Sequence, residues 1–155
     1  MNRVSVLAFI AVAAIGGAVA LEEESNSPAA LQERCADQAK RVFTAEGWPL
    51  DGRVVNYSVA HYTSQFNARL GRCLMLVAYT TNDPRDRNTR KSYTVSDAFE
   101  QATFAEYFES GLPGFSTAVL QCNLTLPKEK HVLCHSAKEW RRLVRPYIET
   151  GALIH

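Results

Sequence analysis

Three side chains of this sequence have the chemistry of a hydrolytic site. His61 supplies an imidazole, the side chain most often used for proton transfer, and Asp97 and Glu100 supply carboxylates that could orient or activate a water molecule. Their positions along the chain do not show that they meet, and the recognised signatures of serine hydrolases, zinc peptidases and phosphate-binding loops are missing. The alternative is structural: the two acids hold a turn or a solvated strand face, and His61 is a hydrogen-bonded surface residue. We expect this structural role.

A second group could bind zinc, because thiolates and imidazoles are its preferred ligands. Cys122, His131, Cys134 and His135 offer four such groups, but their spacing is not that of a recognised zinc knuckle. Strand alternation would place both histidines with Leu133 on one face and both cysteines on the other. We therefore expect a disulfide and two surface histidines, with no metal and no cofactor.

The expected state of the four cysteines depends on the compartment in which the protein folds. Thiols outside the cytoplasm normally form disulfides. The segment between Cys122 and Cys134 alternates like two short strands around a Pro-Lys-Glu turn, which places these two cysteines opposite each other. Cys35 and Cys73 then form the other bond. The sequence predicts the disulfides Cys35–Cys73 and Cys122–Cys134.

Residues 1–20 have the pattern of a cleavable export signal. Arg3 precedes an apolar run over residues 4–15, and small residues end the segment at Ala20. A membrane anchor is the alternative, but the apolar run is shorter than the roughly 20 residues that a spanning helix needs. We expect a periplasmic or extracellular protein with no integral membrane segment in its mature chain.

After the signal, residues 21–27 are predicted to form a disordered leader and residues 28–155 a single domain. The whole chain has 17 Lys+Arg against 16 Asp+Glu, a formal net charge of +1. No overall basic excess exists to attract phosphates or anionic lipid, so nucleic acid and membrane surfaces are disfavoured as partners. Locally, Arg141, Arg142 and Arg145 could bind an acidic partner, although such charges are usually a solvated helix face.

Helix signals occur at both ends of this domain. Ser27 and Pro28 are typical of a helix start, Cys35 falls on the apolar stripe that follows, and Gly47 is a stop, which predicts a helix over residues 28–46. Ser136-Ala137-Lys138-Glu139 is a capping box, and it precedes a second apolar stripe, Trp140, Leu143, Val144, Tyr147 and Ile148. Pro146 should kink this second helix or end it early.

Strand signals fill the middle of the chain. Residues 55–60 alternate as a strand does, and residues 73–79 are apolar enough for a central strand covered on both faces. Residues 80–89 are loop-like, whereas residues 91–109 fit either two strands or a helix, with two strands favoured. The fold class predicted is α+β: an antiparallel sheet flanked by an N-terminal and a C-terminal helix, with two disulfides.

A set of short motifs resembles a family of small exported bacterial proteins that have no established activity. The motifs are Cys35-Ala36, His61-Tyr62, Leu70-Gly71-Arg72-Cys73-Leu74, Asp97-Ala98-Phe99-Glu100, Cys122-Asn123-Leu124 and Cys134-His135-Ser136 with Glu139-Trp140. Thr63 and Trp140 depart from the family pattern, which has Asn and Phe there, so this chain would be a divergent member. The resemblance implies a bacterial exported protein and no mechanism.

Together these features favour a binding or accessory module without catalytic activity. Its exposed aromatics would include Tyr57, Tyr62 and Tyr79. The partner is unknown, an envelope or secreted protein being one candidate. The alternative function is a small secreted hydrolase that uses His61 with Asp97 or Glu100.

Overall fold

The computed structural model describes residues 26–54, 57–85, 87–112, 117–126 and 130–149. The predicted export signal, residues 1–20, lies outside the described residues, as does the predicted leader up to residue 25. Within the described residues no helix is both long and apolar enough to cross a membrane.

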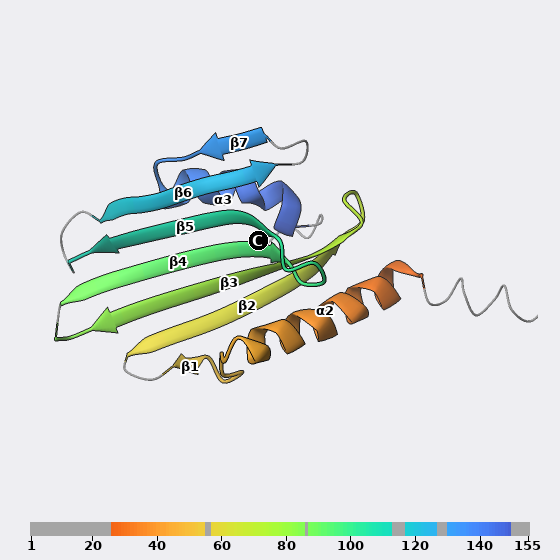
Figure 1. Ribbon diagram of the computed structural model, residues 1–155, viewed down its shortest axis with the longest axis horizontal. Helices are drawn as coiled ribbons and strands as arrows, with labels where there is room; N and C mark the ends of the chain where they lie inside the picture. Colours follow the sequence, from red (N-terminus) through yellow and green to blue (C-terminus); the bar gives the residue numbers. More distant parts are fainter. Residues whose placement is uncertain (1–25, 55–56, 86, 113–116, 127–129, 150–155) are drawn as a thin grey trace, which may run out of the picture.

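The described chain forms a seven-stranded antiparallel sheet whose spatial order follows the sequence, β1 to β7 (Figure 1). The strands are β1 (Arg53–Val54), β2 (Ser58–Asn67), β3 (Arg72–Asp83), β4 (Asn88–Asp97), β5 (Thr103–Gly111), β6 (Ala118–Leu126) and β7 (Lys130–Leu133). Helix α2 (Pro28–Ala45) precedes the sheet and helix α3 (Ala137–Ile148) follows it. This is the predicted α+β fold, an antiparallel sheet with a helix at each end of the chain.

Helix α2 has the predicted start and end. The Ser27 hydroxyl accepts a hydrogen bond from the Ala30 amide at 3.2 Å, and Pro28 occupies the first turn. Gly47 follows the C-terminus with a φ of 85°, a conformation that glycine adopts without strain. The helix buries Cys35 and Phe43, among others, against the sheet.

Helix α3 also begins as predicted. The Ser136 hydroxyl accepts a hydrogen bond from the Glu139 amide at 3.2 Å, and the Glu139 carboxylate accepts one from the His135 amide at 3.0 Å. Pro146 lies in the last turn, and the helix ends two residues later at Ile148. Trp140 and Val144 are buried by the sheet.

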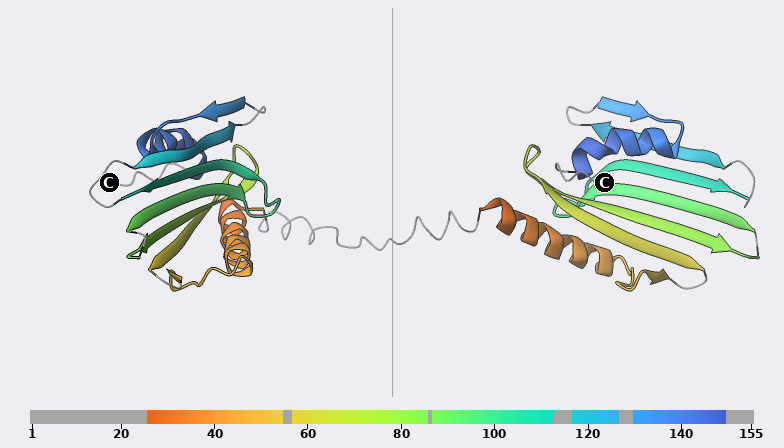
Figure 2. Two further views of the ribbon diagram at one scale, coloured as in Figure 1. Left: turned by 60° about the vertical axis from the view of Figure 1, so that its left-hand side comes forward. Right: turned by 180° about the vertical axis from the view of Figure 1, so that it is seen from behind.

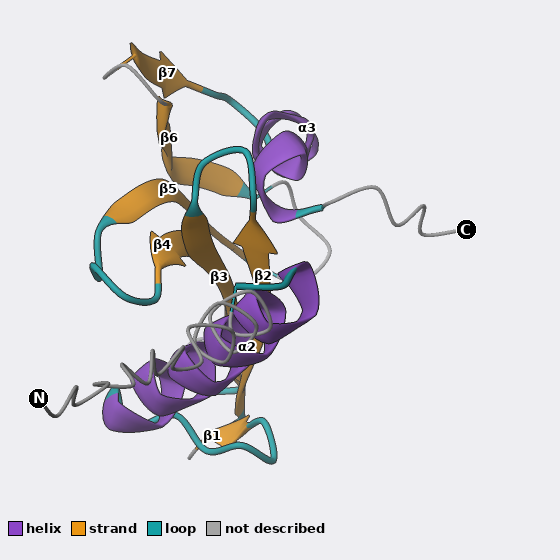
Figure 3. Cartoon of the chain, turned by 90° about the vertical axis from the view of Figure 1, so that its right-hand side faces the viewer, coloured by secondary structure: helices purple, strands orange, loops and turns teal. Residues whose placement is uncertain are grey.

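The two helices cover opposite faces of the sheet and create two apolar cores. Along β3 the side chains alternate: Cys73 and Met75 join the core under α2, while Leu74 joins the core under α3. Helix α3 lies behind the sheet in Figure 1 and in front of it in the right-hand view of Figure 2, and α2 runs beside β2 (Figure 3). The strand predicted over residues 73–79 is therefore covered on both faces at residues 73–75, whereas residues 76–79 are half-buried.

Residues 91–109 form parts of two strands, β4 and β5, as favoured from the sequence. Two other boundaries were predicted wrongly. Of the strand expected over residues 55–60, residues 55 and 56 lie outside the described residues; Tyr57 has a φ of 66° and precedes the strand, so β2 begins at Ser58. The loop expected over residues 80–89 is much shorter, because β3 continues to Asp83 and β4 begins at Asn88.

The last hairpin has the register expected from its sequence. Leu124 pairs with Val132, and the Cys134 amide donates to the Cys122 carbonyl at 3.0 Å. The disulfide Cys122–Cys134 joins α-carbons 5.0 Å apart. Leu133 is 74% exposed on the opposite face of the strand. Because both cysteines are oxidised, they have no thiolate to offer a metal, and the zinc alternative is wrong.

Candidate functional site

The structure separates the three catalytic candidates into two places. His61 is an exposed residue of β2, paired with Ala78 of β3. Its ring lies over Gly52: a β-carbon built on that glycine would be 2.6 Å from His61 Cε1. Gly52 also has a φ of 75°, so both its backbone and its neighbour require glycine. His61 thus packs against the β1 turn.

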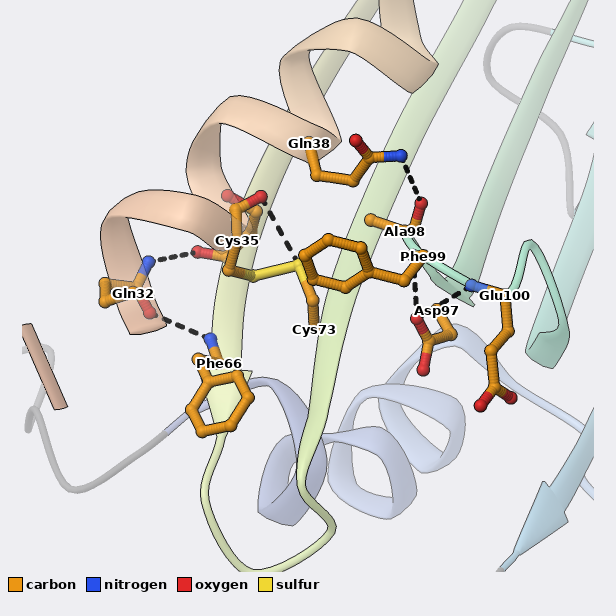
Figure 4. Close-up of a disulfide and its surroundings, with 10 residues drawn as sticks. Gln32, Cys35, Gln38, Phe66, Cys73, Asp97, Ala98, Phe99 and Glu100 are labelled. Atoms are coloured by element: carbon orange, nitrogen blue, oxygen red, sulfur yellow. Dashed lines mark hydrogen bonds between the residues drawn. A yellow bond between two sulfur atoms is a disulfide. The ribbon is translucent and has the colours of Figure 1, made fainter. Parts of the chain in front are cut away.

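Asp97 and Glu100 meet at the turn between β4 and β5. The Asp97 side chain is almost fully buried, and its Oδ1 accepts hydrogen bonds from the amides of Phe99 at 2.8 Å and Glu100 at 3.2 Å (Figure 4). Arg72 donates to Asp97 Oδ2 at 3.2 Å and also to the Glu100 carboxylate. The two acids therefore hold the turn and bind one guanidinium.

The distance between these places follows from the strand register. Asp97 pairs with Leu74, which pairs with Gln65, and His61 lies four residues further along the same strand as Gln65. Two strand spacings and four residues of rise separate the α-carbons of His61 and Asp97 by about 16 Å. A general acid and base must come within hydrogen-bond reach or within one bridging water of the same group. The structure does not bring His61 together with either acid.

The turn that Asp97 holds is joined to α2 through the Cys35–Cys73 disulfide (Figure 4). The Ala98 amide donates to the Cys73 carbonyl at 2.8 Å, and the Gln38 side chain of α2 donates to the Ala98 carbonyl at 3.1 Å. The disulfide spans α-carbons 5.2 Å apart and fixes α2 on β3, as predicted.

Another α2 side chain closes the edge of β2 beyond the short strand β1. The Gln32 amide donates to the Ser64 carbonyl at 3.3 Å and accepts from the Phe66 amide at 2.8 Å, as a neighbouring strand would (Figure 4). An edge occupied in this way is protected from pairing with a foreign strand. This part of the molecule is built for stability.

A groove lies on the α2 side of the sheet. Helix α2 packs on β2 and β3, and the described part of α2 does not pack on β4. The uncovered strip next to the helix is a groove of about 280 Å³, lined by Glu46, Trp48, Met75, Val77, Tyr79, Ser92, Thr94 and Ser96. Its walls combine aromatic rings with a row of hydroxyl groups.

The aromatic wall is held in place by its own polar atoms. The ring centroids of Trp48 and Tyr79 are 5.2 Å apart, with the ring planes tilted by 45°. Trp48 Nε1 donates to the Glu46 carboxylate at 3.1 Å, and the Tyr79 hydroxyl donates to Ser58 Oγ at 3.2 Å. Both rings are half-buried, so part of each faces the groove.

A row of hydroxyls on β4, the strand paired with β3, also lines the groove. Ser92, Thr94 and Ser96 occur at every second position, so they point to the same face about 6.5 Å apart. All three are half-buried, and none of the three hydroxyls has a hydrogen-bond partner among the described residues. Glu46 is the one charged residue that lines the groove, so the lining carries a single negative charge.

Of the residues that line this groove, the sequence pointed only to Tyr79, as one of the exposed aromatics of a binding module. Tyr62 and Tyr79 were predicted as exposed aromatics, but both are half-buried: Tyr62 packs on Phe43 with ring centroids 4.5 Å apart, and Tyr79 packs on Trp48. Tyr57, by contrast, is 68% exposed. The alternation of polar and apolar residues along β4 does show in the sequence that the three hydroxyls share one face of the strand. It does not show whether another element covers that face.

The buried carboxylate of Glu109 lies on the other face of the sheet, the face that α3 covers. Glu109 accepts hydrogen bonds from the Tyr107 hydroxyl at 2.5 Å and from Lys91 Nζ at 3.2 Å. Burial by itself raises the pKa of Glu109, but the hydrogen bonds from Tyr107 and Lys91 and the charge of Lys91 outweigh it and lower the pKa below its usual value of 4.5. Burial and the Glu109 carboxylate both raise the pKa of Tyr107.

The lowered pKa predicts an acid-dependent contribution of Glu109 to stability. The carboxylate stabilises the native state above the pKa of the unfolded chain, and this contribution is lost as the pH falls through the lower native pKa. Glu109→Gln should therefore destabilise the protein near pH 6 and differ less from wild type near pH 3, as measured by urea unfolding. An equal difference at both pH values would contradict the assignment.

Comparison with known proteins adds no relative to this description. No protein-family model matches the chain, and neither a curated protein nor a solved structure matches it. The resemblance to small exported bacterial proteins therefore remains a prediction based on the quoted motifs. Function has to be inferred from the geometry of the groove and of the surface.

Proposed function

We propose that the protein is an exported, non-catalytic binding or accessory module that holds a small neutral ligand in the groove beside α2. The observation that carries this proposal is the row of unpaired hydroxyls on β4 beside the fixed rings of Trp48 and Tyr79. Aromatic faces next to hydroxyls suit a molecule that has both an apolar face and hydrogen-bonding groups.

The size of the groove supports a ligand of one or two rings. Pockets for small molecules typically measure about 300 to 1,000 Å³, and this groove, at about 280 Å³, lies just below that range. The lining has no cationic residue and one carboxylate, that of Glu46, which disfavours an anion, and its hydroxyls suit an uncharged molecule. A pyranose sugar combines an apolar ring face with hydroxyls and is the first probe to use.

A binding role is preferred to hydrolysis because the described residues do not form an acid/base pair from the three candidates. Asp97 is engaged by two amides and by Arg72, and His61 lies about 16 Å away along the sheet. The disulfides support export, since such bonds persist in oxidising compartments. The periplasm or the extracellular medium of a bacterium is the proposed location.

The groove can be tested through the chain's two tryptophans, Trp48 and Trp140. In an NMR titration with N-acetylglucosamine and other neutral sugars, we expect saturable shifts at the Trp48 indole and at the amides of residues 92–96, with the buried Trp140 indole unchanged. Thr94→Val should weaken this binding at least threefold, because one hydroxyl of the row is lost.

Thr63→Val is the matched control, since it makes the same change at an exposed strand position on the opposite face of the sheet. It should bind like wild type. If other neutral ring compounds bound at the same residues and sugars did not, the groove would still be the binding site, and the ligand would be a ring compound other than a sugar. If no neutral probe gave saturable shifts there, or if Thr63→Val weakened binding as much as Thr94→Val, the proposal would be wrong.

A further inference from the structure

The solvent-facing side of α3 carries a concentrated row of positive charges. Lys138, Arg141, Arg142 and Arg145 are all exposed, and their spacing of i, i+3, i+4 and i+7 places them on one stripe. We call these four residues the cationic stripe. Trp140 is buried on the opposite side of the same helix.

Most of this charge is not neutralised within the described part of the chain. Arg145 pairs with Glu149 at 2.6 Å, and the Glu139 carboxylate is engaged at the N-terminal cap by the His135 amide. Lys138, Arg141 and Arg142 have no ion pair among the described residues. The near-zero net charge of the chain therefore conceals a local excess.

The helix presents the stripe as a rigid and open surface. Helix α3 is fixed to the sheet by Trp140 and Val144, and the Asn67 side chain donates to the Tyr147 carbonyl at 2.9 Å. The four cations extend over about 10 Å of helix length. Exposed clusters of Arg and Lys recognise either acidic motifs or anionic membrane surfaces. The stripe lies on the solvent-facing side of a helix and does not line the groove beside α2, so a planar anionic surface is the better match.

We propose that the cationic stripe docks the protein on the surface of a bilayer that contains anionic phospholipid. The interaction is electrostatic, because the apolar side of α3 is already buried in the protein and is not free to insert. Each cation near such a surface strengthens binding about fivefold. This inference is independent of the groove, which lies on the other face of the sheet.

Co-sedimentation of the purified, disulfide-bonded chain with lipid vesicles tests the proposal. At about 0.01 M salt, vesicles containing phosphatidylglycerol should bind the protein and vesicles of phosphatidylcholine alone should bind much less. The double variant Arg141→Glu with Arg142→Glu should reduce binding at least about 25-fold. Salt at about 1 M should abolish the difference between the two lipids, because the Debye length falls to about 3 Å.

The matched control reverses the same number of charges on the other helix. Arg34 and Arg41 are exposed on α2, and Arg34→Glu with Arg41→Glu should bind like wild type. Equal loss in both double variants would show that only net charge matters and would overturn the stripe. Absence of wild-type binding to the anionic vesicles would also overturn the proposal. If polyglutamate, a model acidic peptide, then bound the same residues, the partner would be an acidic protein segment instead. Unchanged melting temperatures establish that each variant is folded.

Discussion

Replacing Cys35 and Cys73 together by alanine is expected to lower the free energy of unfolding by about 4 kcal/mol. The bond closes a loop of 38 residues, and the loss of chain entropy that it imposes on the unfolded state has this magnitude. For a domain of this size the melting temperature should fall by about 15 °C. Thermal and urea unfolding of the double variant, compared with wild type, measure both quantities.

The Cys122–Cys134 bond provides the comparison. It closes only 12 residues, so its removal should cost about 3 kcal/mol, less than the removal of Cys35–Cys73. All four sulfur atoms are buried, and alanine therefore leaves a similar small void in each variant. An unchanged melt after reduction of wild type, or the reverse order of the two double variants, would refute the role given to the longer loop.

The elements that could be predicted from the sequence are those in which neighbouring residues determine the structure. The Ser27 cap, the capping box at Ser136 and the alternation around the last hairpin are local patterns, and each occurs as expected. The cysteine pairing followed from the hairpin, because its register placed Cys122 opposite Cys134 and left one other pair.

The strand boundaries were predicted wrongly where contacts between residues distant in the sequence determine the local structure. Tyr57 continues a strand-like alternation, yet the pairing of β1 with β2 requires a turn with positive φ at that position. The polar composition of residues 80–89 is typical of a loop. Pairing between β3 and β4 nevertheless extends β3 to Asp83 and starts β4 at Asn88. Local propensity is a weak guide when a partner strand supplies the hydrogen bonds.

The candidate site was less predictable than the fold, for a related reason. His61, Asp97 and Glu100 were selected by chemical type, and only the register shows that His61 lies apart from the other two. The groove depends on how far α2 extends across the sheet, and neither Trp48 nor the β4 hydroxyls carry a motif that reveals this. Polar positions on an open sheet face that line a groove have the same sequence pattern as ordinary solvated strand residues.

The core under α3 should depend strongly on Trp140. Its ring packs against Tyr93 and Tyr107, with centroids 5.5 and 6.1 Å away, and the side chain is 1% exposed. Trp140→Ala should cost about 3 to 5 kcal/mol, because it removes this packing and leaves a cavity. Urea unfolding of the variant measures the loss.

Trp140→Phe should cost only about 1 kcal/mol, although it also shortens the side chain. The Trp140 Nε1 atom is buried and has no hydrogen-bond partner among the described residues, so removing it relieves a desolvation penalty that offsets part of the lost packing. Trp48 is the matched control: it is half-buried and its Nε1 is bound to Glu46, so Trp48→Ala should cost less than Trp140→Ala. If Trp140→Phe were as destabilising as Trp140→Ala, the indole nitrogen would have to make an essential contact, and the apolar description of this core would be wrong.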